Sequence, residues 1–180
     1  GGGGAGRGTS SGGAGGKGSG GRLAFEYLKM VAGIDIVHVP YKGTGAMLTD
    51  LIAGQTQATS AGAPPLLPHV KSGKLRAIAV GTPQRLAALP DVATVAQQGY
   101  PGFETSQWYG IIVPAKTPDA IVNKLAEEIA KATKSPEVLE RFRRDGTIAV
   151  GSTPEEFADF IQKEQARWGE VVRQSGVKVE

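Results

Sequence analysis

A regular alternation of short β-branched runs with helix-forming stretches is the feature that most constrains the fold. The runs IDIVHV (34–39) and LRAIAV (75–80) are predicted strands because they are short and rich in isoleucine and valine. The stretch RLAFEYLKMVAG (22–33) is a predicted helix, with apolar residues at helical spacing and a glycine at its end. This alternation indicates an α/β fold with a largely parallel sheet, which binds ligands at the carboxyl ends of its strands.

The last third of the chain is predicted to be mostly helical. Three helices begin there at a hydroxyl residue followed by proline: Thr117-Pro118, Ser135-Pro136 and Thr153-Pro154. The hydroxyl can cap the first turn, and proline fits the first helical position. Glu156 would complete a capping box with Thr153. Before these helices, QWYGIIVP (107–114) is a predicted strand that ends at its proline.

The first 21 residues differ from the rest because they contain 13 of the chain's 27 glycines. Residues 1–14 show no hydrophobic periodicity. We therefore expect residues 1–15 to be a disordered segment, a linker or non-native sequence. No signal peptide is visible in the sequence.

Composition disfavours several classes of function. The net charge is only +3 and no basic run is interleaved with aromatic residues, so no nucleic-acid partner is expected. The chain has no cysteine, which excludes thiolate metal sites and cysteine nucleophiles. No run of 18 apolar residues occurs, so direct membrane insertion is not expected.

The sequence also lacks the motifs of common enzymes. Neither H-E-x-x-H nor G-x-S-x-G occurs, and the two histidines, His38 and His69, lie in different predicted elements. No pair of residues resembles a general acid and base held in one pocket. We therefore predict that the protein is not an enzyme and has no catalytic residue, cofactor or metal site.

The segment Gly16–Gly21 matches the dinucleotide fingerprint G-x-G-x-x-G. That motif needs a strand directly before it and an acidic residue at the end of the next strand. Residues 1–14 are not expected to form this strand, and Asp35 comes too early for the acidic residue. A nucleotide- or phosphate-binding α/β enzyme that uses this loop remains the alternative function.

Three predicted helices open through glycine-containing loops, Gly18-Ser19-Gly20-Gly21, Lys42-Gly43-Thr44-Gly45 and Ala61-Gly62-Ala63-Pro64. Each loop places backbone N–H groups at a helix N-terminus, where the helix dipole favours a carboxylate or phosphate. Any one of the loops could be an ordinary α/β turn. Three of them at one edge of a sheet favour a site for a small anion.

A series of stretches, specific in combination, covers residues 16–180. The series is GSGGRLAFEYLK (18–29), HVPYKG (38–43), LLPHVKSGKLRAIAV (66–80), LPDVATVAQQGYPGFE (89–104), WYGIIVPAKTP (108–118) and STPEEFADFIQKEQARWGEVVRQSG (152–176). In these stretches the chain resembles the periplasmic solute-binding proteins of tripartite tricarboxylate transporters.

The resemblance implies a periplasmic-binding-protein-like, two-lobed Venus flytrap fold with mainly parallel sheets. Residues 16–105 would form ligand-binding lobe 2, and residues 106–180 would complete lobe 1. The protein would be periplasmic, monomeric at full length, and would pass a small carboxylate to a membrane permease. In this family, loops of both lobes hold the carboxylate. The matching residues here are Gly18, Ser19, Gly20, Ala61, Gly62 and Ala63, with Tyr41, Lys42 and Thr44 as further candidates. Tyr41 and Lys42 either contact the ligand or brace their loop.

The chain departs from the family pattern in three ways. Family members are much longer, and their first half supplies most of one lobe. Where they have an apolar strand before the first loop, this chain has GRGTSSGGAG (6–15). Arg22 stands where histidine is common in the family, and Gln97 where an acidic residue is usual. We therefore expect the N-terminal half-lobe to be absent, the strand GIIV (110–113) to be exposed, and this polypeptide alone to bind weakly or aggregate.

Overall fold

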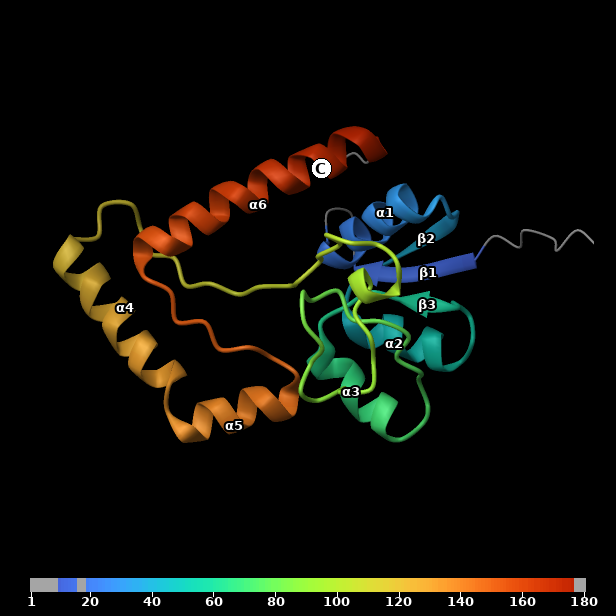
Figure 1. Ribbon diagram of the computed structural model, residues 1–180, viewed down its shortest axis with the longest axis horizontal. Helices are drawn as coiled ribbons and strands as arrows, with labels where there is room; N and C mark the ends of the chain where they lie inside the picture. The colour runs from blue at the N-terminus through green and yellow to red at the C-terminus, as the bar shows by residue number, and fades with distance from the viewer. Residues whose placement is uncertain (1–9, 16–18, 177–180) are drawn as a thin grey trace, which may run out of the picture. The chain divides into compact units, whose positions relative to one another are not determined.

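A computed structural model describes residues 10–15 and 19–176 of the 180-residue chain. It is an α/β structure that divides into two compact units (Figure 1). The first unit consists of two segments, the N-terminal part of the chain up to Ala61 and the C-terminal part from Val171. The second unit is Gly62–Glu170. The predicted lobe boundary between residues 105 and 106 does not coincide with this division and stays a prediction. In the described part of the chain, no helix is long and apolar enough to cross a membrane.

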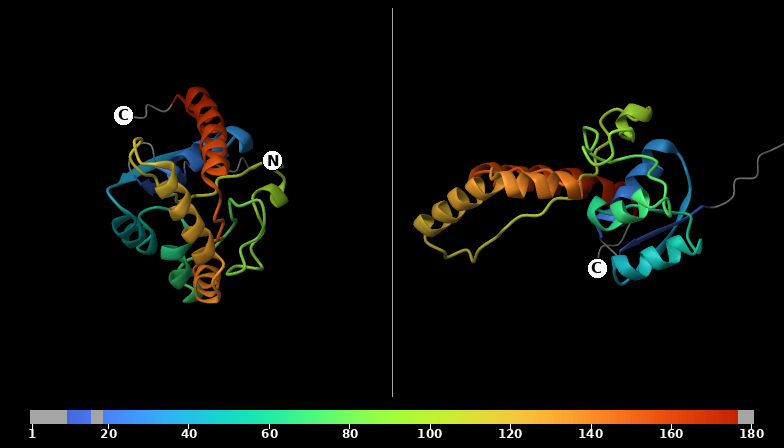
Figure 2. Two further views of the ribbon diagram at one scale, coloured as in Figure 1. Left: turned by 90° about the vertical axis from the view of Figure 1, so that its left-hand side faces the viewer. Right: turned by 90° about the horizontal axis from the view of Figure 1, so that it is seen from below.

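The first unit is built on a three-stranded parallel sheet. Its order is β2-β1-β3, formed by β1 (Ser10–Gly15), β2 (Ile36–Tyr41) and β3 (Ala58–Thr59). Helices α1 (Gly20–Ala32) and α2 (Thr44–Ile52) follow β1 and β2 in the chain. They cover opposite faces of the sheet (Figure 2). Successive residues of β1 show this, since Gly12 faces a side chain of α1 and Gly13 faces a side chain of α2.

The central strand β1 contradicts the expectation that the glycine-rich start has no regular structure. Ser10–Gly15 pairs with β2 along its whole length, from Ser10 opposite Ile36 to Gly15 opposite Tyr41. Glycine is needed here because both neighbouring layers press onto the strand. A Cβ on Gly12 would lie 2.9 Å from Ile36 and 3.0 Å from Phe25. The predicted segment 1–15 is thus wrong for Ser10–Gly15, and residues 1–9 lie outside the described chain.

The core of the first unit lies between the sheet and α1. Ala14, Phe25 and Ile36 are buried together, and Ala58 of β3 packs against them. Helix α1 begins at the cap Ser19 and ends at Gly33, whose φ of 61° is the left-handed conformation that stops a helix. The predicted end of this helix at Gly33 is confirmed.

The second unit contains four helices and one short 3₁₀ turn in the described residues. The helices are α3 (Ala63–Lys71), α4 (Asp119–Thr133), α5 (Pro136–Asp145) and the larger part of α6 (Pro154–Ser175), and the 3₁₀ turn is η1 (Ala96–Gln98). Two predicted starts are confirmed, because Ser135 caps α5 and Thr153 forms a capping box with Glu156. The start of α4 lies one residue later than predicted, with Pro118 as its N-cap.

Two predicted strands of the second unit do not form. Residues 75–80 make only one bridge, between Val80 and Thr94, and Ile78 is 73% exposed. Residues 107–114 are extended but belong to no sheet, and the expected exposure of GIIV is confirmed, with Ile112 82% exposed. A strand needs a neighbour with which to exchange backbone hydrogen bonds. Among the described residues of the second unit, segment 75–80 finds such a neighbour only at Val80, and segment 107–114 finds none.

Candidate functional site

The carboxyl edge of the parallel sheet brings helix N-termini together in the first unit. Because β1 pairs in parallel with both β2 and β3, the loops that follow all three strands leave from the same edge. The first and third of these loops touch. A Cβ on Gly21, in the first turn of α1, would lie almost on the carbonyl oxygen of Ser60 after β3. Only glycine allows this close approach of two backbones.

Ser19 and Gly20 lie at the start of α1, as predicted for a ligand-binding helix N-terminus. The Ser19 side chain caps the helix, since its Oγ accepts a hydrogen bond of 3.3 Å from the backbone N–H of Arg22. The hydroxyl can still donate its own hydrogen to an anion. The third predicted residue of this loop, Gly18, lies outside the described residues.

The N-terminus of α2 is the most open of the predicted loops. Gly43 is its N-cap and provides no side-chain hydrogen bond, while Thr44, Gly45 and Ala46 of the first turn are exposed. The N–H groups of this turn are therefore available to an anion. Lys42, just before the cap, is exposed and can add a positive charge.

Tyr41, at the end of β2, makes a hydrogen bond to the helix that follows it. Its hydroxyl donates a 2.9 Å hydrogen bond to Asp50 Oδ2 on α2. Partial burial and this bond to the carboxylate raise the pKa of the Tyr41 phenol. Of the two interpretations left open by the sequence, the structure favours bracing of the β2–α2 loop for Tyr41.

The third loop continues from the first unit into the second. Ala61 is the last residue of the first unit, and Gly62 and Ala63 begin the second, with Gly62 as the N-cap of α3. Pro64 and Pro65 then occupy the first turn of α3. Because proline has no N–H, backbone donors at this N-terminus come only from the residues before Pro64.

The helices α1, α2 and α3, which follow the strands of the sheet, differ from α4, α5 and α6 in the charge of their first turns. No acidic residue occurs in the first turn of α1, α2 or α3. Each of the other helices has at least one, namely Asp119 in α4, Glu137 in α5, and Glu155 and Glu156 in α6. An acidic side chain in the first turn neutralises the positive end of a helix. The N-termini at the predicted site are thus left positive.

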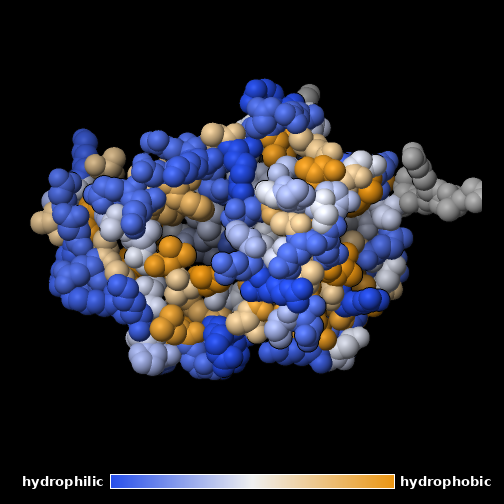
Figure 3. Space-filling model, viewed as in Figure 1, coloured by the Kyte–Doolittle hydropathy of each residue, from blue (hydrophilic) through white to orange (hydrophobic). Residues whose placement is uncertain are grey.

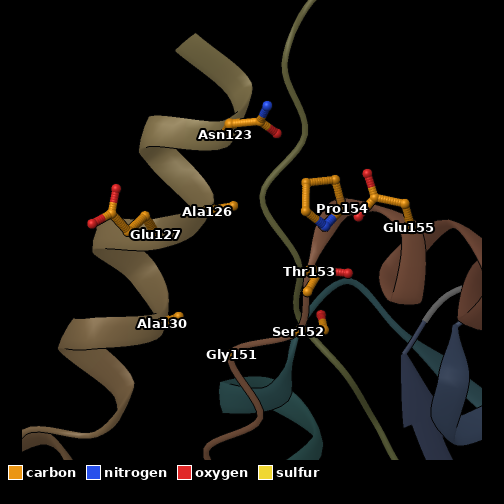
Figure 4. A pocket seen from close by; sticks show the side chains of 9 residues that line it. All are labelled: Asn123, Ala126, Glu127, Ala130, Gly151, Ser152, Thr153, Pro154 and Glu155. Atoms are coloured by element: carbon orange, nitrogen blue, oxygen red, sulfur yellow. The ribbon is translucent and has the colours of Figure 1, made fainter. Parts of the chain in front are cut away.

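The structure also contains a cavity of about 290 Å³ elsewhere, between α4 and the start of α6 (Figure 4). Its walls include the carboxylates Glu127 and Glu155. The N–H groups of Thr153 and Glu156 at the start of α6 are already engaged, because each donates to the side chain of the other. Two negative side chains and an occupied helix end make this cavity unsuitable for an anion. Among the described residues, no group of His, Cys, Asp and Glu could hold a metal ion.

Glu164 on α6 is a buried carboxylate that sequence patterns did not reveal. Its Oε2 accepts hydrogen bonds from the indole N–H groups of Trp108 and Trp168, at 3.2 and 3.1 Å. Its Oε1 lies 2.6 Å from Nη2 of Arg167, which also donates through Nη1 to the backbone oxygen of Glu104. This group, the Glu164 cluster, fastens segment 104–108 to α6. Arg167 and Trp168 lie three and four positions after Glu164 on α6, but Trp108 lies 56 positions before it, so no local spacing indicates the complete group.

A strand before the Gly16–Gly21 loop removes one objection to the dinucleotide interpretation, since β1 ends at Gly15 and α1 follows. The second objection stands. Strand β2 ends at Tyr41, which Lys42 follows, so no acidic residue is placed to bind a ribose.

Comparison with known proteins identifies the family of the chain. The family model described as "Tripartite tricarboxylate transporter family receptor" matches residues 7–177. The chain belongs to this receptor family. The chain is 36% identical to protein BugT of Bordetella pertussis over 162 residues, which are 90% of this chain and 50% of BugT. It is 33% identical to a UPF0065 protein of a Pseudomonas species, over 83% of this chain and 45% of that protein. The receptor chain spans about half the length of these relatives.

Several solved structures share the α/β fold of the chain. The R. palustris protein Rpa4515, solved with adipate, superposes with a TM-score of 0.86 at 33% identity, over 93% of this chain and 56% of that one. MatC from Rhodopseudomonas palustris, with bound malate, gives a TM-score of 0.78 at 29% identity, over 91% and 56%. Periplasmic binding protein BugD gives 0.83 at 28% identity, over 94% and 57%.

Proposed function

We propose that this receptor chain is part of an extracytoplasmic, periplasmic solute-binding protein. It captures a small carboxylate metabolite and passes it to the membrane permease of a tripartite tricarboxylate-type transporter. It binds the metabolite without chemical change. The observation that carries the proposal is the pair of helix N-termini of α1 and α2, which lie at one sheet edge and contain no acidic residue in their first turns.

The chemistry of this edge fits a carboxylate. Backbone N–H groups at a helix N-terminus donate hydrogen bonds to anionic oxygens, and the dipole adds a favourable potential. Thr44 N–H, Ser19 Oγ and the Lys42 side chain supply donors of three kinds. Two solved relatives hold dicarboxylates, adipate in one and malate in the other, which supports the same class of ligand here.

A charge introduced at a helix cap tests the proposal. Ser19→Asp keeps a capping side chain on α1, because aspartate caps a helix as well as serine does. It places a negative charge where the carboxylate is proposed to bind. We expect affinity for malate and adipate, measured by ligand-observed NMR, to fall about fivefold or more, as repulsion between two charges about 4 Å apart in water would cause.

The chain offers a matched control for this variant. Ser135 caps α5 in the same way, accepting from Val138 N–H at 3.4 Å. Ser135→Asp should therefore leave ligand affinity unchanged. Equal binding by wild type and Ser19→Asp would contradict the proposed site, and binding of a nucleotide in preference to any carboxylate would favour the alternative enzyme.

A further inference from the structure

A hydrogen bond from Tyr41 to Asp50 closes the connection between β2 and α2. Tyr41 is the last residue of β2, and its hydroxyl donates to Asp50 Oδ2, within α2, at 2.9 Å. Nine positions separate the two half-buried residues, so the bond spans the loop and the first part of the helix. Both residues belong to the first unit, as do the N-termini of α1 and α2.

The first turn of α2 has little else to fix its orientation. Gly43, the N-cap, supplies no side-chain hydrogen bond, and the backbone bond from Met47 N–H to the Gly43 carbonyl is long, at 3.4 Å. Among the described residues, no atom lies within 4 Å of a Cβ built on Gly43 or Gly45. Helix α1 differs, because Ser19 caps it directly. The orientation of the first turn of α2 therefore depends on contacts made further along the helix.

The ring of Tyr41 is itself held by the packing of the first unit. A Cβ on Gly13, in the central strand β1, would lie 3.1 Å from ring carbon Cε2 of Tyr41 and 3.2 Å from Met47 Cγ. The ring and Met47 therefore lie against the same face of β1. Thr56, which is only 3% exposed, packs against the same point, with its Oγ1 3.5 Å from that Cβ. A hydroxyl on so constrained a ring is a fixed donor, and it holds Asp50 at a defined place relative to the central strand.

We propose that Asp50 is a positioning residue for the carboxylate site, which acts through Tyr41 to fix the first turn of α2. The bond to Tyr41 anchors the helix to the strand that leads into it, so the N–H groups of Thr44 and Gly45 keep one direction at the sheet edge. The inference rests on the proposed function and assigns a role to a residue that does not touch the ligand. Donors held in place in advance bind an anion more tightly, because less conformational freedom is lost on binding.

Titration of the full chain with malate and adipate, followed by ligand-observed NMR, tests the role of Asp50. Asp50→Ala removes the acceptor, and affinity should fall about threefold to tenfold, the factor that corresponds to the loss of one hydrogen bond. Asp50→Asn keeps an oxygen that can accept from Tyr41 and should restore affinity to within about twofold of wild type. Thr49→Ala is the matched control, because it removes only the hydrogen bond from Thr49 to the Gly45 carbonyl within the same helix. It should also leave affinity within about twofold.

A second variant breaks the same bond from the other side. Tyr41→Phe removes the hydroxyl and keeps the ring over Gly13, so it tests the bond even if Asp50→Ala does not fold. Tyr41→Phe should lower affinity as much as Asp50→Ala does, and combining the two changes should lower it no further, because both remove one interaction. Additive losses would make Tyr41 a ligand contact in its own right and would overturn the positioning role of Asp50.

The remaining outcomes distinguish this inference from the function on which it rests. Wild-type affinity in Asp50→Ala, or an equal loss in Thr49→Ala, would overturn the positioning role and leave the proposed function intact. The same loss in Asp50→Asn as in Asp50→Ala would assign the effect to charge and would also overturn it. A wild-type chain that binds neither malate, adipate nor any other carboxylate would overturn the proposed function together with this inference.

Discussion

Single residues of the first unit show how close packing selects glycine. Gly12 and Gly13 sit in the central strand, with Phe25 of α1 on one face and Met47 of α2 on the other. A Cβ at residue 13 would lie 3.2 Å from Met47. The helices can approach the sheet this closely only because the strand has no side chains at these positions.

Substitution of Gly12 by alanine should destabilise the first unit. The added methyl would overlap Ile36 and Phe25, and overpacking of this kind costs about 1–3 kcal/mol. Gly45→Ala in the first turn of α2 is the control, because no atom lies within 4 Å of its added Cβ. It should be neutral or add up to about 1 kcal/mol. Urea unfolding followed by circular dichroism measures both changes, and equal stabilities would contradict the close packing of β1.

His38 on β2 gives a prediction about pH. Neither ring nitrogen has a hydrogen-bond partner among the described residues. Burial, assisted by the nearby positive charge of Arg22, lowers the pKa of His38 below its usual value of 6.5, while Glu26 opposes the shift. The folded protein therefore binds a proton on His38 less readily than the unfolded chain does.

The sign of the effect follows from proton linkage. Stability due to neutral His38 is complete above pH 6.5 and is lost progressively as the pH falls towards the lower pKa of the folded state. His38→Gln should reduce this loss between pH 7.5 and pH 5, measured as the change in urea midpoint. An unchanged pH dependence in the variant would show that His38 does not contribute.

At the scale of elements, the Glu164 cluster joins α6 to an extended segment that has no sheet partner. The carboxylate is largely buried and neutralised by Arg167, and it accepts from both tryptophans of the chain. Removing one member of such a network leaves its partners without hydrogen bonds, which costs about 1–3 kcal/mol.

Glu164→Gln should lower the stability of the second unit by this amount and change tryptophan fluorescence. Because both indoles donate to the same carboxylate oxygen, their emission reports directly on the cluster. Glu128→Gln is the control, since Glu128 forms exposed ion pairs with Lys124 and Lys131 on α4. That variant should leave the emission unchanged. If Glu164→Gln does the same, the two tryptophans do not share this carboxylate in solution.

At the scale of the whole molecule, the second unit presents apolar side chains without a covering layer. Figure 3 shows apolar residues on the visible surface near α4 and α5. Tyr109, Ile111 and Ile112 are among the most exposed apolar residues of the described chain, with Ile148 and Val150. Backbone groups of residues 108–113 have no hydrogen-bond partner in another described segment. Such an extended segment can pair with a strand from another polypeptide.

We predict that the chain self-associates through this surface. Replacing both Ile111 and Ile112 by lysine should shift the protein towards monomer, because it removes apolar area and adds repulsive charge. Met30→Lys on α1 adds charge at an exposed apolar residue of the first unit and should not change self-association. Sedimentation velocity at several concentrations measures the distribution. A wild-type chain that stays monomeric throughout would contradict the prediction.

Local interactions made much of the structure predictable from sequence. Ser135 and Thr153 cap their helices through contacts to residues three positions away, and Gly33 ends α1 through its own left-handed conformation. The family was also predictable, because its stretches lie in order along the chain. The loop residues Ser19 and Thr44 were predicted at helix N-termini and lie there. Whether they bind a ligand stays a proposal.

Sequence patterns alone sufficed for most helix ends, for the α/β class and for the receptor family, because these depend on neighbours within a few positions or on ordered motifs. The role of a glycine-rich segment as the central strand became visible only in the folded chain, where Phe25, Ile36 and Met47 exclude side chains from it. The tertiary structure also decided that the apolar runs at 75–80 and 107–114 form no sheet. Strand formation depends on a partner that can lie anywhere in the chain or outside it, and no local pattern contains that information.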